Sequence, residues 1–129
     1  MEYKKYYNTE LFEFKTFYNL EEIEKYYVEK TNTYSFEENG VYLNVIFLFD
    51  LEVNSNIYAN DIIAERMICL NISASTIEAS NITATRIIAN TICANNVNVH
   101  GNIIYSDKIV IRFYTRCEGL LHNTLSNWY

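Results

Sequence analysis

Residues 55–99 read SNIYA NDIIA ERMIC LNISA STIEA SNITA TRIIA NTICA NNVNV, and this run of five-residue blocks decides the fold. The third residue of every block is large and apolar, beginning with Ile57. The fifth residue is small, and this second column later widens to Val99, Ile104 and Ile109. A fixed period of this kind is the signature of a repeat architecture.

Neither regular secondary structure buries both columns. An α-helix turns by about 100° per residue, so a five-residue step carries the large column around every face of the helix. A flat strand alternates with period two, so an odd repeat moves the column to the opposite face at each block. A chain that turns a corner every five residues keeps both columns inside. The sequence therefore predicts a mainly β protein with a short quadrilateral, four-sided β-helix, in which residues about twenty apart stack.

The blocks, for example Asn71-Ile72-Ser73-Ala74, resemble the pentapeptide-repeat family over roughly residues 55–104. The resemblance implies a right-handed quadrilateral β-helix. The family pattern places a small residue two positions before a large Leu or Phe, whereas here the large residue comes first, in Ile-x-Ala order. In this respect the chain is similar to short NIxA-repeat proteins of Firmicutes, their phages and mobile elements. That second resemblance implies no common activity.

The remaining sequence is expected to cap the two ends of the β-helix, because an open end exposes unpaired backbone groups. Residues 1–53 predict a small, acidic, aromatic α+β cap of β-α-β-β order. Residues 54–107 form the predicted β-helix, and residues 108–129 a short C-terminal strand and helix cap.

Within the N-terminal cap, alternation predicts a strand over residues 10–18. A helix is expected over about 20–30, capped by Asn19. Asn39-Gly40 is the strongest short hairpin signal in the chain, and strict alternation predicts one long strand over residues 41–53. Phe12, Phe14 and Tyr18 are expected on one side of the strand, and Leu20, Ile23 and Tyr27 on one face of the helix.

Within the C-terminal cap, Ile109, Ile111 and Phe113 alternate and predict a strand that Gly119 breaks. The helical spacing of Leu121, Leu125 and Trp128 predicts a helix that closes the last coil.

The net charge of −6 disfavours direct binding of nucleic acid, which needs a basic footprint. Residues 1–53 hold eleven acidic and five basic side chains, so the acidity belongs to the N-terminal part. The sequence has neither an apolar leader nor an apolar run of about 18 residues, so we expect no membrane association. The three cysteines are odd in number and widely spaced, which favours reduced thiols in a cytoplasmic protein.

The residues that could carry chemistry form no recognisable catalytic or metal-binding set. His100, His122 and Cys117 match no standard metal spacing, and no nucleophile motif such as GxSxG occurs. We therefore predict no catalytic residues, no metal and no cofactor. Cys69 lies in the small column and is expected to replace a buried alanine, while Cys93 occupies an outward position.

Two groups of side chains are candidates for contact with a partner. The first is the acidic, Tyr-rich N-terminal part, comprising Glu21, Glu22, Glu24, Tyr26, Glu29, Glu37 and Glu38. The second follows from twenty-residue stacking, which would place Arg66 over Arg86 and Ile68 over Ile88. For both groups the alternative is a solvated or self-covered surface.

These observations favour a non-catalytic protein–protein interaction module. One form of it is an inhibitor, encoded by a phage or mobile element, of a host nucleic-acid enzyme, comparable to anti-CRISPR proteins or gyrase inhibitors. The alternative is a self-assembling structural β-helix, with a homodimer formed through an end or a face of the helix. An enzyme or a carbohydrate-binding solenoid is the least favoured class.

Overall fold

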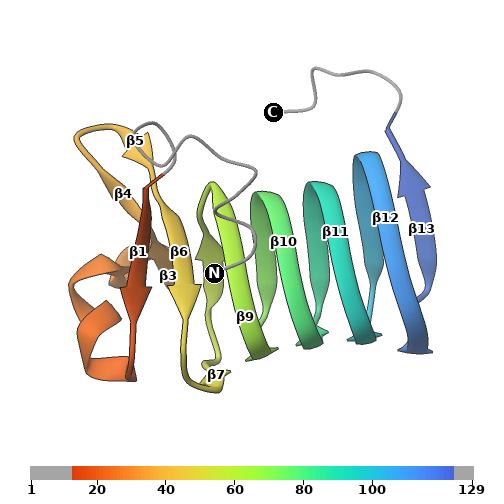
Figure 1. Ribbon diagram of the computed structural model, residues 1–129, viewed down its shortest axis with the longest axis horizontal. Helices are drawn as coiled ribbons and strands as arrows, with labels where there is room; N and C mark the ends of the chain where they lie inside the picture. Colours follow the sequence, from red (N-terminus) through yellow and green to blue (C-terminus); the bar gives the residue numbers. More distant parts are fainter. Residues whose placement is uncertain (1–12, 124–129) are drawn as a thin grey trace.

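The computed structural model describes residues 13–123 and shows a β-solenoid of about five turns (Figure 1). The N-terminal elements are strand β1 (Phe14–Phe17), 3-10 helix η2 (Leu20–Tyr26), β2 (Tyr27–Val28), 3-10 helix η3 (Glu29–Thr31), β3 (Thr33–Ser35), β4 (Glu37–Glu38), β5 (Val41–Tyr42), β6 (Asn44–Phe47) and β7 (Leu51–Glu52). The coils are formed by β8 (Asn56–Tyr58), β9 (Asp61–Ile68), β10 (Asn71–Ala84), β11 (Arg86–Val99), β12 (Asn102–Arg116) and β13 (Gly119–His122). The prediction of a mainly β protein built around a β-helix is confirmed.

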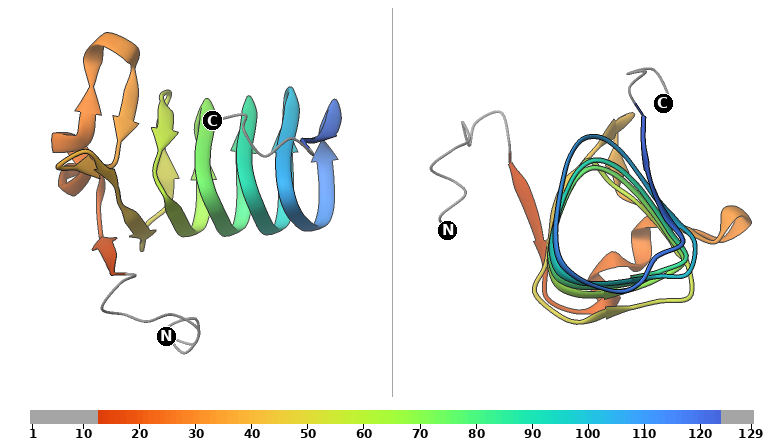
Figure 2. Two further views of the ribbon diagram at one scale, coloured as in Figure 1. Left: turned by 90° about the horizontal axis from the view of Figure 1, so that it is seen from above. Right: turned by 90° about the vertical axis from the view of Figure 1, so that its right-hand side faces the viewer.

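The coil has three sides, so the prediction of a four-sided coil is wrong. Ile72 pairs in parallel with Ile57 on one side and with Ile87 on the other, a spacing of fifteen residues. Three blocks of five therefore make one turn, and the view along the axis shows a triangle (Figure 2). A four-sided coil with sides of the same length encloses a much larger cross-section than a three-sided coil. It adds only one more large and one more small inward side chain per turn to fill that space. The inward-facing large residues from Ile57 to Val97 are at most 1% exposed, so they fill the triangular interior.

Each side of the triangle is a parallel sheet with its own column of inward-facing large residues. The first side carries Tyr34, Ile57, Ile72, Ile87, Ile103 and Leu120 in register. The second side carries Val45, Ile62, Ile77, Ile92 and Ile109 in register, and the exposed Lys15 pairs with Val45 at its N-terminal end. The third side carries Leu51, Met67, Ile82, Val97 and Tyr114 in register.

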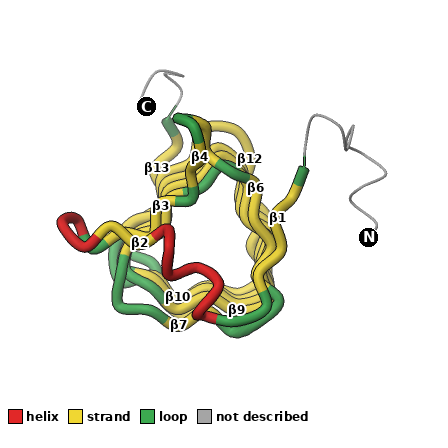
Figure 3. The backbone as a smooth tube through the Cα atoms, turned by 90° about the vertical axis from the view of Figure 1, so that its left-hand side faces the viewer, coloured by secondary structure: helices red, strands yellow, loops and turns green. Residues whose placement is uncertain are grey.

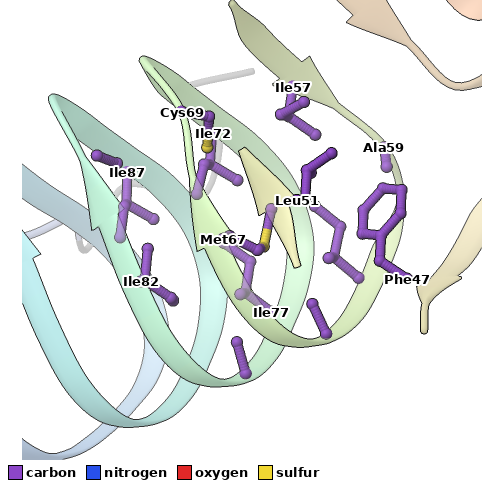
Figure 4. Close-up of a cluster of buried hydrophobic side chains, with 14 of the residues drawn as sticks. Phe47, Leu51, Ile57, Ala59, Met67, Cys69, Ile72, Ile77, Ile82 and Ile87 are labelled. Atoms are coloured by element: carbon purple, nitrogen blue, oxygen red, sulfur yellow. The ribbon is translucent and has the colours of Figure 1, made fainter. Parts of the chain in front are cut away.

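The predicted interior columns are confirmed through residue 99. Every large residue from Ile57 to Val97 is at most 1% exposed, and these side chains meet in the centre of the triangle (Figure 4). The small column is also buried, apart from Ala74, which is partly buried.

Beyond residue 99 the predicted columns are wrong. Ile103, rather than Ile104, takes the inward position and pairs with Ile87, because one extra residue enters the coil at the corner containing Gly101. A side chain at residue 101 would place its Cβ 2.8 Å from the carbonyl oxygen of Thr85, so this corner requires glycine. A further extra residue precedes Ile109, which joins the large column.

A 3-10 helix crosses the N-terminal end of the solenoid (Figure 3). A cluster of buried aromatic rings closes this end. Phe36 is fully buried and lies 5.1–5.7 Å, between ring centroids, from Tyr26, Phe17 and Phe47. β1 pairs with β6 in parallel, and β6 stacks on β9, so the cap continues the second side of the coil.

Helix η2 begins at Leu20 with Asn19 as its N-cap, as predicted, but it is a 3-10 helix that ends at Tyr26. In a 3-10 helix residues three apart share a face, so Ile23 and Tyr26 are buried together and Tyr27 is exposed. Leu20 is the first residue of the helix and is also exposed. The prediction for the first strand is also wrong at its end, because Phe17 is buried and Tyr18 is 62% exposed. Phe12 lies outside the described residues.

The Asn39-Gly40 hairpin is confirmed. Both residues have positive φ, 54° and 78°, as a tight two-residue turn requires, and β4 pairs with β5 in antiparallel register. The long strand predicted over 41–53 is instead divided into β5, β6 and β7, because it turns corners of the coil. Its inward alternation nevertheless holds from Leu43 to Val53.

The C-terminal strand is confirmed as part of β12, but Gly119 begins strand β13 rather than ending a strand. Leu121 lies in β13 and is 48% exposed, so it does not belong to the predicted closing helix. Leu125 and Trp128 lie outside the described residues. No helix among residues 13–123 is long and apolar enough to span a membrane.

Candidate interaction surfaces

The acidic residues of the N-terminal cap lie on its exposed surface. Glu21 and Glu24 project from η2, Glu29 from η3 and Glu37 from β4, and all four are exposed. We call these four residues the acidic cap. They offer a negatively charged surface at the end of the solenoid where the aromatic cluster lies.

Three of the predicted contact residues have structural partners within the cap. Glu22 and Asn19 fix the start of η2: the Asn19 side chain accepts from the Glu22 backbone N–H, and the Glu22 carboxylate accepts from the backbone N–H of the preceding Tyr18 at 2.6 Å. Glu38 accepts from the Tyr26 hydroxyl at 2.6 Å and from the Lys15 ammonium at 2.9 Å. These bonds hold the pKa of Glu38 below its ordinary value, with the Tyr26 bond as the largest cause.

The prediction that Tyr26 presents its ring to a partner is wrong, because only 6% of the residue is exposed. The ring belongs to the aromatic cluster, against Phe17 and Phe36. Burial of Tyr26 follows from the 3-10 geometry of η2, which sequence spacing alone did not reveal.

The structure separates the two pairs that twenty-residue stacking would have joined. Arg66 and Ile68 lie on the third side, where Ile68 pairs with Thr83. Arg86 and Ile88 lie on the first side, where Ile88 pairs with Ser73. The predicted face of two arginines beside two isoleucines does not exist, because fifteen residues, not twenty, make one turn.

A groove follows the corner between the first and second sides. It has a volume of about 530 Å³ and is lined by Tyr42, Tyr58, Ala59, Ser73, Ala74, Ser75, Ile88 and Asn90. We call it the corner groove. Its floor consists of small residues, and Tyr42 and Tyr58, each at least 40% exposed, stand at one end. None of its lining residues carries a charge.

Sequence reasoning missed the corner groove because it depends on the turn length. Read at a spacing of fifteen, Tyr58, Ser73 and Ile88 form one outward column in which a serine lies between two large residues. This gap was visible in the sequence once the period was known. The sequence does not show that Tyr42, from the β4–β5 hairpin, also lines the groove.

The C-terminal end of the solenoid exposes apolar residues. Val110, Phe113, Tyr114, Leu120 and Leu121 are between 43% and 60% exposed. Tyr114 and Leu120 belong to the inward columns, and they are exposed because no further coil among residues 13–123 covers them. Val110, Phe113 and Leu121 face outward beside this end, where they pair with Cys93, Asn96 and Ile104. Among residues 13–123, no strand pairs with the outer edge of residues 108–116. We call this surface the open end.

The candidate metal and thiol residues lie apart from one another. His100 is at the corner between the third and first sides, while His122 stacks on Tyr105 at the next corner and approaches the Ser106 carbonyl at 3.1 Å. Within residues 13–123, no three or more His, Cys, Asp or Glu side chains lie close enough together to hold a metal ion. Cys69 is buried, as predicted, and burial raises the pKa of its thiol to about 12. Cys93 is partly exposed on the second side, beside Glu78 and Val110.

The chain was compared with models of known protein families, with curated proteins and with solved structures, and none of these comparisons gave a match.

Proposed function

We propose that this chain is a non-catalytic protein-interaction module that joins a second copy of itself at the open end and presents its acidic cap to another protein. The observation that carries the proposal is the difference between the two ends of the solenoid. The N-terminal end is closed by aromatic residues and surrounded by exposed glutamates, whereas the C-terminal end exposes apolar side chains and a strand edge.

A second copy suits the open end because apolar surface then meets apolar surface. A two-fold axis perpendicular to the solenoid brings the two open ends together with their edge strands antiparallel, so backbone groups of residues 108–116 gain partners. Association stops at two copies, since the aromatic cluster closes each outer end. A closed dimer is therefore favoured over the open-ended scaffold that was the alternative.

The acidic cap suits a protein with a basic binding groove, such as an enzyme that acts on nucleic acid. Exposed carboxylates steer a basic partner and set the orientation of the encounter more than they add affinity. By occupying such a groove, the chain would act as an inhibitor that competes with the nucleic acid.

The dimer is tested by measuring mass in solution. We expect the unaltered chain to have twice the monomer mass, and the pair Tyr114→Glu with Leu120→Glu to have the monomer mass, because both residues belong to the inward columns and the new carboxylates would be buried between the two ends. The matched control is Val41→Glu with Leu48→Glu, two similarly exposed residues at the other end. A monomer at every concentration for the unaltered chain would exclude the dimer, and growing assemblies would favour the scaffold.

The acidic cap is tested by affinity capture with Glu21, Glu24 and Glu29 changed to Lys. Glu22 and Glu38 are left unchanged, because they stabilise the cap itself. A control with Glu78, Asp107 and Glu118 changed to Lys carries the same charge change on the coils. Recovery of a nucleic-acid enzyme that only the cap variant loses, and that weakens with salt, supports this role. Equal recovery with both variants argues against it.

A further inference from the structure

A second hollow lies on the outer surface of the third side, where β9, β10, β11 and β12 follow one another. It has a volume of about 320 Å³. Its polar lining comes from Arg66, Asn81, Thr83, Asn96, Asn98 and Thr115. We call it the third-side pocket. Unlike the corner groove, it is built mainly of groups that form hydrogen bonds.

A β-bulge interrupts the pairing of strands at one end of the third-side pocket. Val97 pairs with Tyr114, but the next residue, Asn98, pairs with Arg116. Thr115 is therefore an extra residue without a partner on β11, and it lines the pocket. Bulges re-aim side chains and are common beside functional sites. The irregularity falls where the polar side chains gather.

Asn98 contributes a buried oxygen atom that has no partner. Among residues 13–123, the Asn98 Oδ1 atom is the one buried side-chain nitrogen or oxygen that forms no hydrogen bond. Buried polar atoms are nearly always paired in folded proteins, so this exception needs an explanation. Because the oxygen has no partner to lose, rotation of the amide toward the pocket presents it to a donor there at no cost in hydrogen bonds.

Arg66 contributes a positive charge two coils away, which is about 10 Å along the axis. Among residues 13–123, Arg66 forms no ion pair, and no Asp or Glu lines the pocket. A guanidinium group of this kind pairs well with a carboxylate, which accepts two parallel hydrogen bonds. Between the two ends, Asn81 accepts from the Asn96 amide at 2.9 Å, so the N–H groups of Asn81 can also donate to a ligand.

These groups together select one class of ligand. Arg66 repels a metal ion, and an inorganic anion such as sulfate brings no donor to the Asn98 oxygen. A hydroxyl group both donates and accepts, so it suits Asn98 and the two threonines of the lining. The volume lies at the lower end of the range for small-molecule sites, which fits a single sugar-sized molecule.

We propose that the third-side pocket binds a sugar acid, with its carboxylate against Arg66 and its hydroxyl groups toward Asn98, Thr83 and Thr115. The inference goes beyond the proposed function, because the ligand is a small molecule rather than a protein. It does not require the dimer, since the whole lining belongs to one chain.

Binding is measured by titrating the isotopically labelled full chain with D-glucuronate and following the side-chain amide signals of Asn81 and Asn98 by NMR. The comparison probes are D-glucose and acetate, which carry the hydroxyl groups and the carboxylate separately. We expect glucuronate to shift both signals at lower concentration than either probe does. Arg66→Gln should weaken glucuronate binding by about tenfold or more, as the loss of a hydrogen bond to a charged group does, and should leave glucose binding unchanged.

Two further variants separate binding from folding. Arg86→Gln is the matched control, because Arg86 is exposed at the equivalent outward position of the first side, and it should bind glucuronate as the unaltered chain does. Asn98→Ala should weaken the binding of both glucuronate and glucose. Since it removes an oxygen that forms no hydrogen bond, it should leave urea unfolding nearly unchanged.

Three results would overturn the proposal. Amide signals that do not respond to glucuronate would mean that water alone serves the Asn98 oxygen. An equal response to acetate and glucuronate would reduce the pocket to a general site for anions. An equal loss of binding in Arg66→Gln and Arg86→Gln would place the ligand elsewhere. Weaker binding in Arg66→Gln and Asn98→Ala alone supports the proposal.

Discussion

The side-chain amide of Asn96 donates to the side-chain oxygen of Asn81 at 2.9 Å, although fifteen residues separate the two. The same bond recurs between Asn71 and Asn56 at 3.0 Å, on another side of the triangle. Each bond joins one coil to the next on the outer surface, where stacked amides of equal spacing reinforce the parallel pairing. The outward asparagines of the repeat are thus stabilising elements.

The Asn96–Asn81 bond should appear as a coupling energy. We expect Asn81→Ala and Asn96→Ala each to reduce the free energy of unfolding by about 0.5–1.5 kcal/mol, the ordinary net value of a hydrogen bond. The double variant should lose less than the sum, because both changes remove one bond. Urea unfolding measures all three. A control cycle between Asn96 and Asn44, which lie on different sides and coils, should be additive, and additivity in the Asn81–Asn96 cycle would contradict the ladder.

The sequence predicted the length of each side but not the number of sides. A five-residue spacing between Ile72 and Ile77 requires a corner in every block, whether the coil has three sides or four. The number of sides depends on how much space the inward side chains fill, which is a property of the whole cross-section. The stacking of Arg66 on Arg86 was inferred from four sides and was wrong for that reason.

The open end and the corner groove could not be predicted from the sequence, because both depend on how the coils stack. Ile109 and Tyr114 look like ordinary strand residues in the sequence, and their exposure follows from the absence of a coil above them among the described residues. The groove requires both the fifteen-residue period and the position of the hairpin that carries Tyr42. The acidic surface, by contrast, was predictable from the distribution of charged residues. The hydrogen bonds that Glu22 and Glu38 accept within the cap were not predictable in this way.

The interior should be more sensitive to truncation in the middle coils than at the open end. Ile77 is fully buried, and Ile77→Ala should cost about 2–5 kcal/mol, from lost transfer energy and the cavity left behind. Ile109 occupies the same column but is only partly buried. Ile109→Ala should cost clearly less in chemical unfolding measurements. An equal cost at both positions would show that the open end is covered in solution.

Glu38 should make the stability of the cap depend on pH. Its pKa is lowered in the folded chain, first by the Tyr26 hydroxyl and then by Lys15. The stabilisation is therefore present above the ordinary pKa of a glutamate and is lost as the pH falls through the lowered value. Glu38→Gln should reduce this loss of stability in acid. The matched control is Glu37→Gln, which changes the exposed residue next to Glu38 and should leave the loss in acid unchanged. The measurement is thermal unfolding across the acidic range, and parallel profiles for the unaltered chain and Glu38→Gln would contradict it.

The thiol of Cys69 should make the stability of the folded chain depend on pH in the alkaline range. Burial raises its pKa from an ordinary value of 9.0 to about 12. The unfolded chain then loses this proton before the folded chain does, so the stabilisation is complete below pH 9.0 and decreases as the pH rises toward about 12. The slope is about 1.4 kcal/mol per pH unit in that interval.

Cys69→Ala tests this dependence, because alanine occupies most other positions of the small column and leaves the packing nearly unchanged. Since tyrosines titrate in the same range, the informative quantity is the difference in unfolding free energy between the unaltered chain and the variant at each pH. That difference should change in favour of Cys69→Ala above pH 9.0. Cys93→Ala, at an outward position, supplies the control for removal of a thiol. A constant difference from pH 8 to pH 11 would mean that the Cys69 thiol ionises in the folded coil as easily as in the unfolded chain.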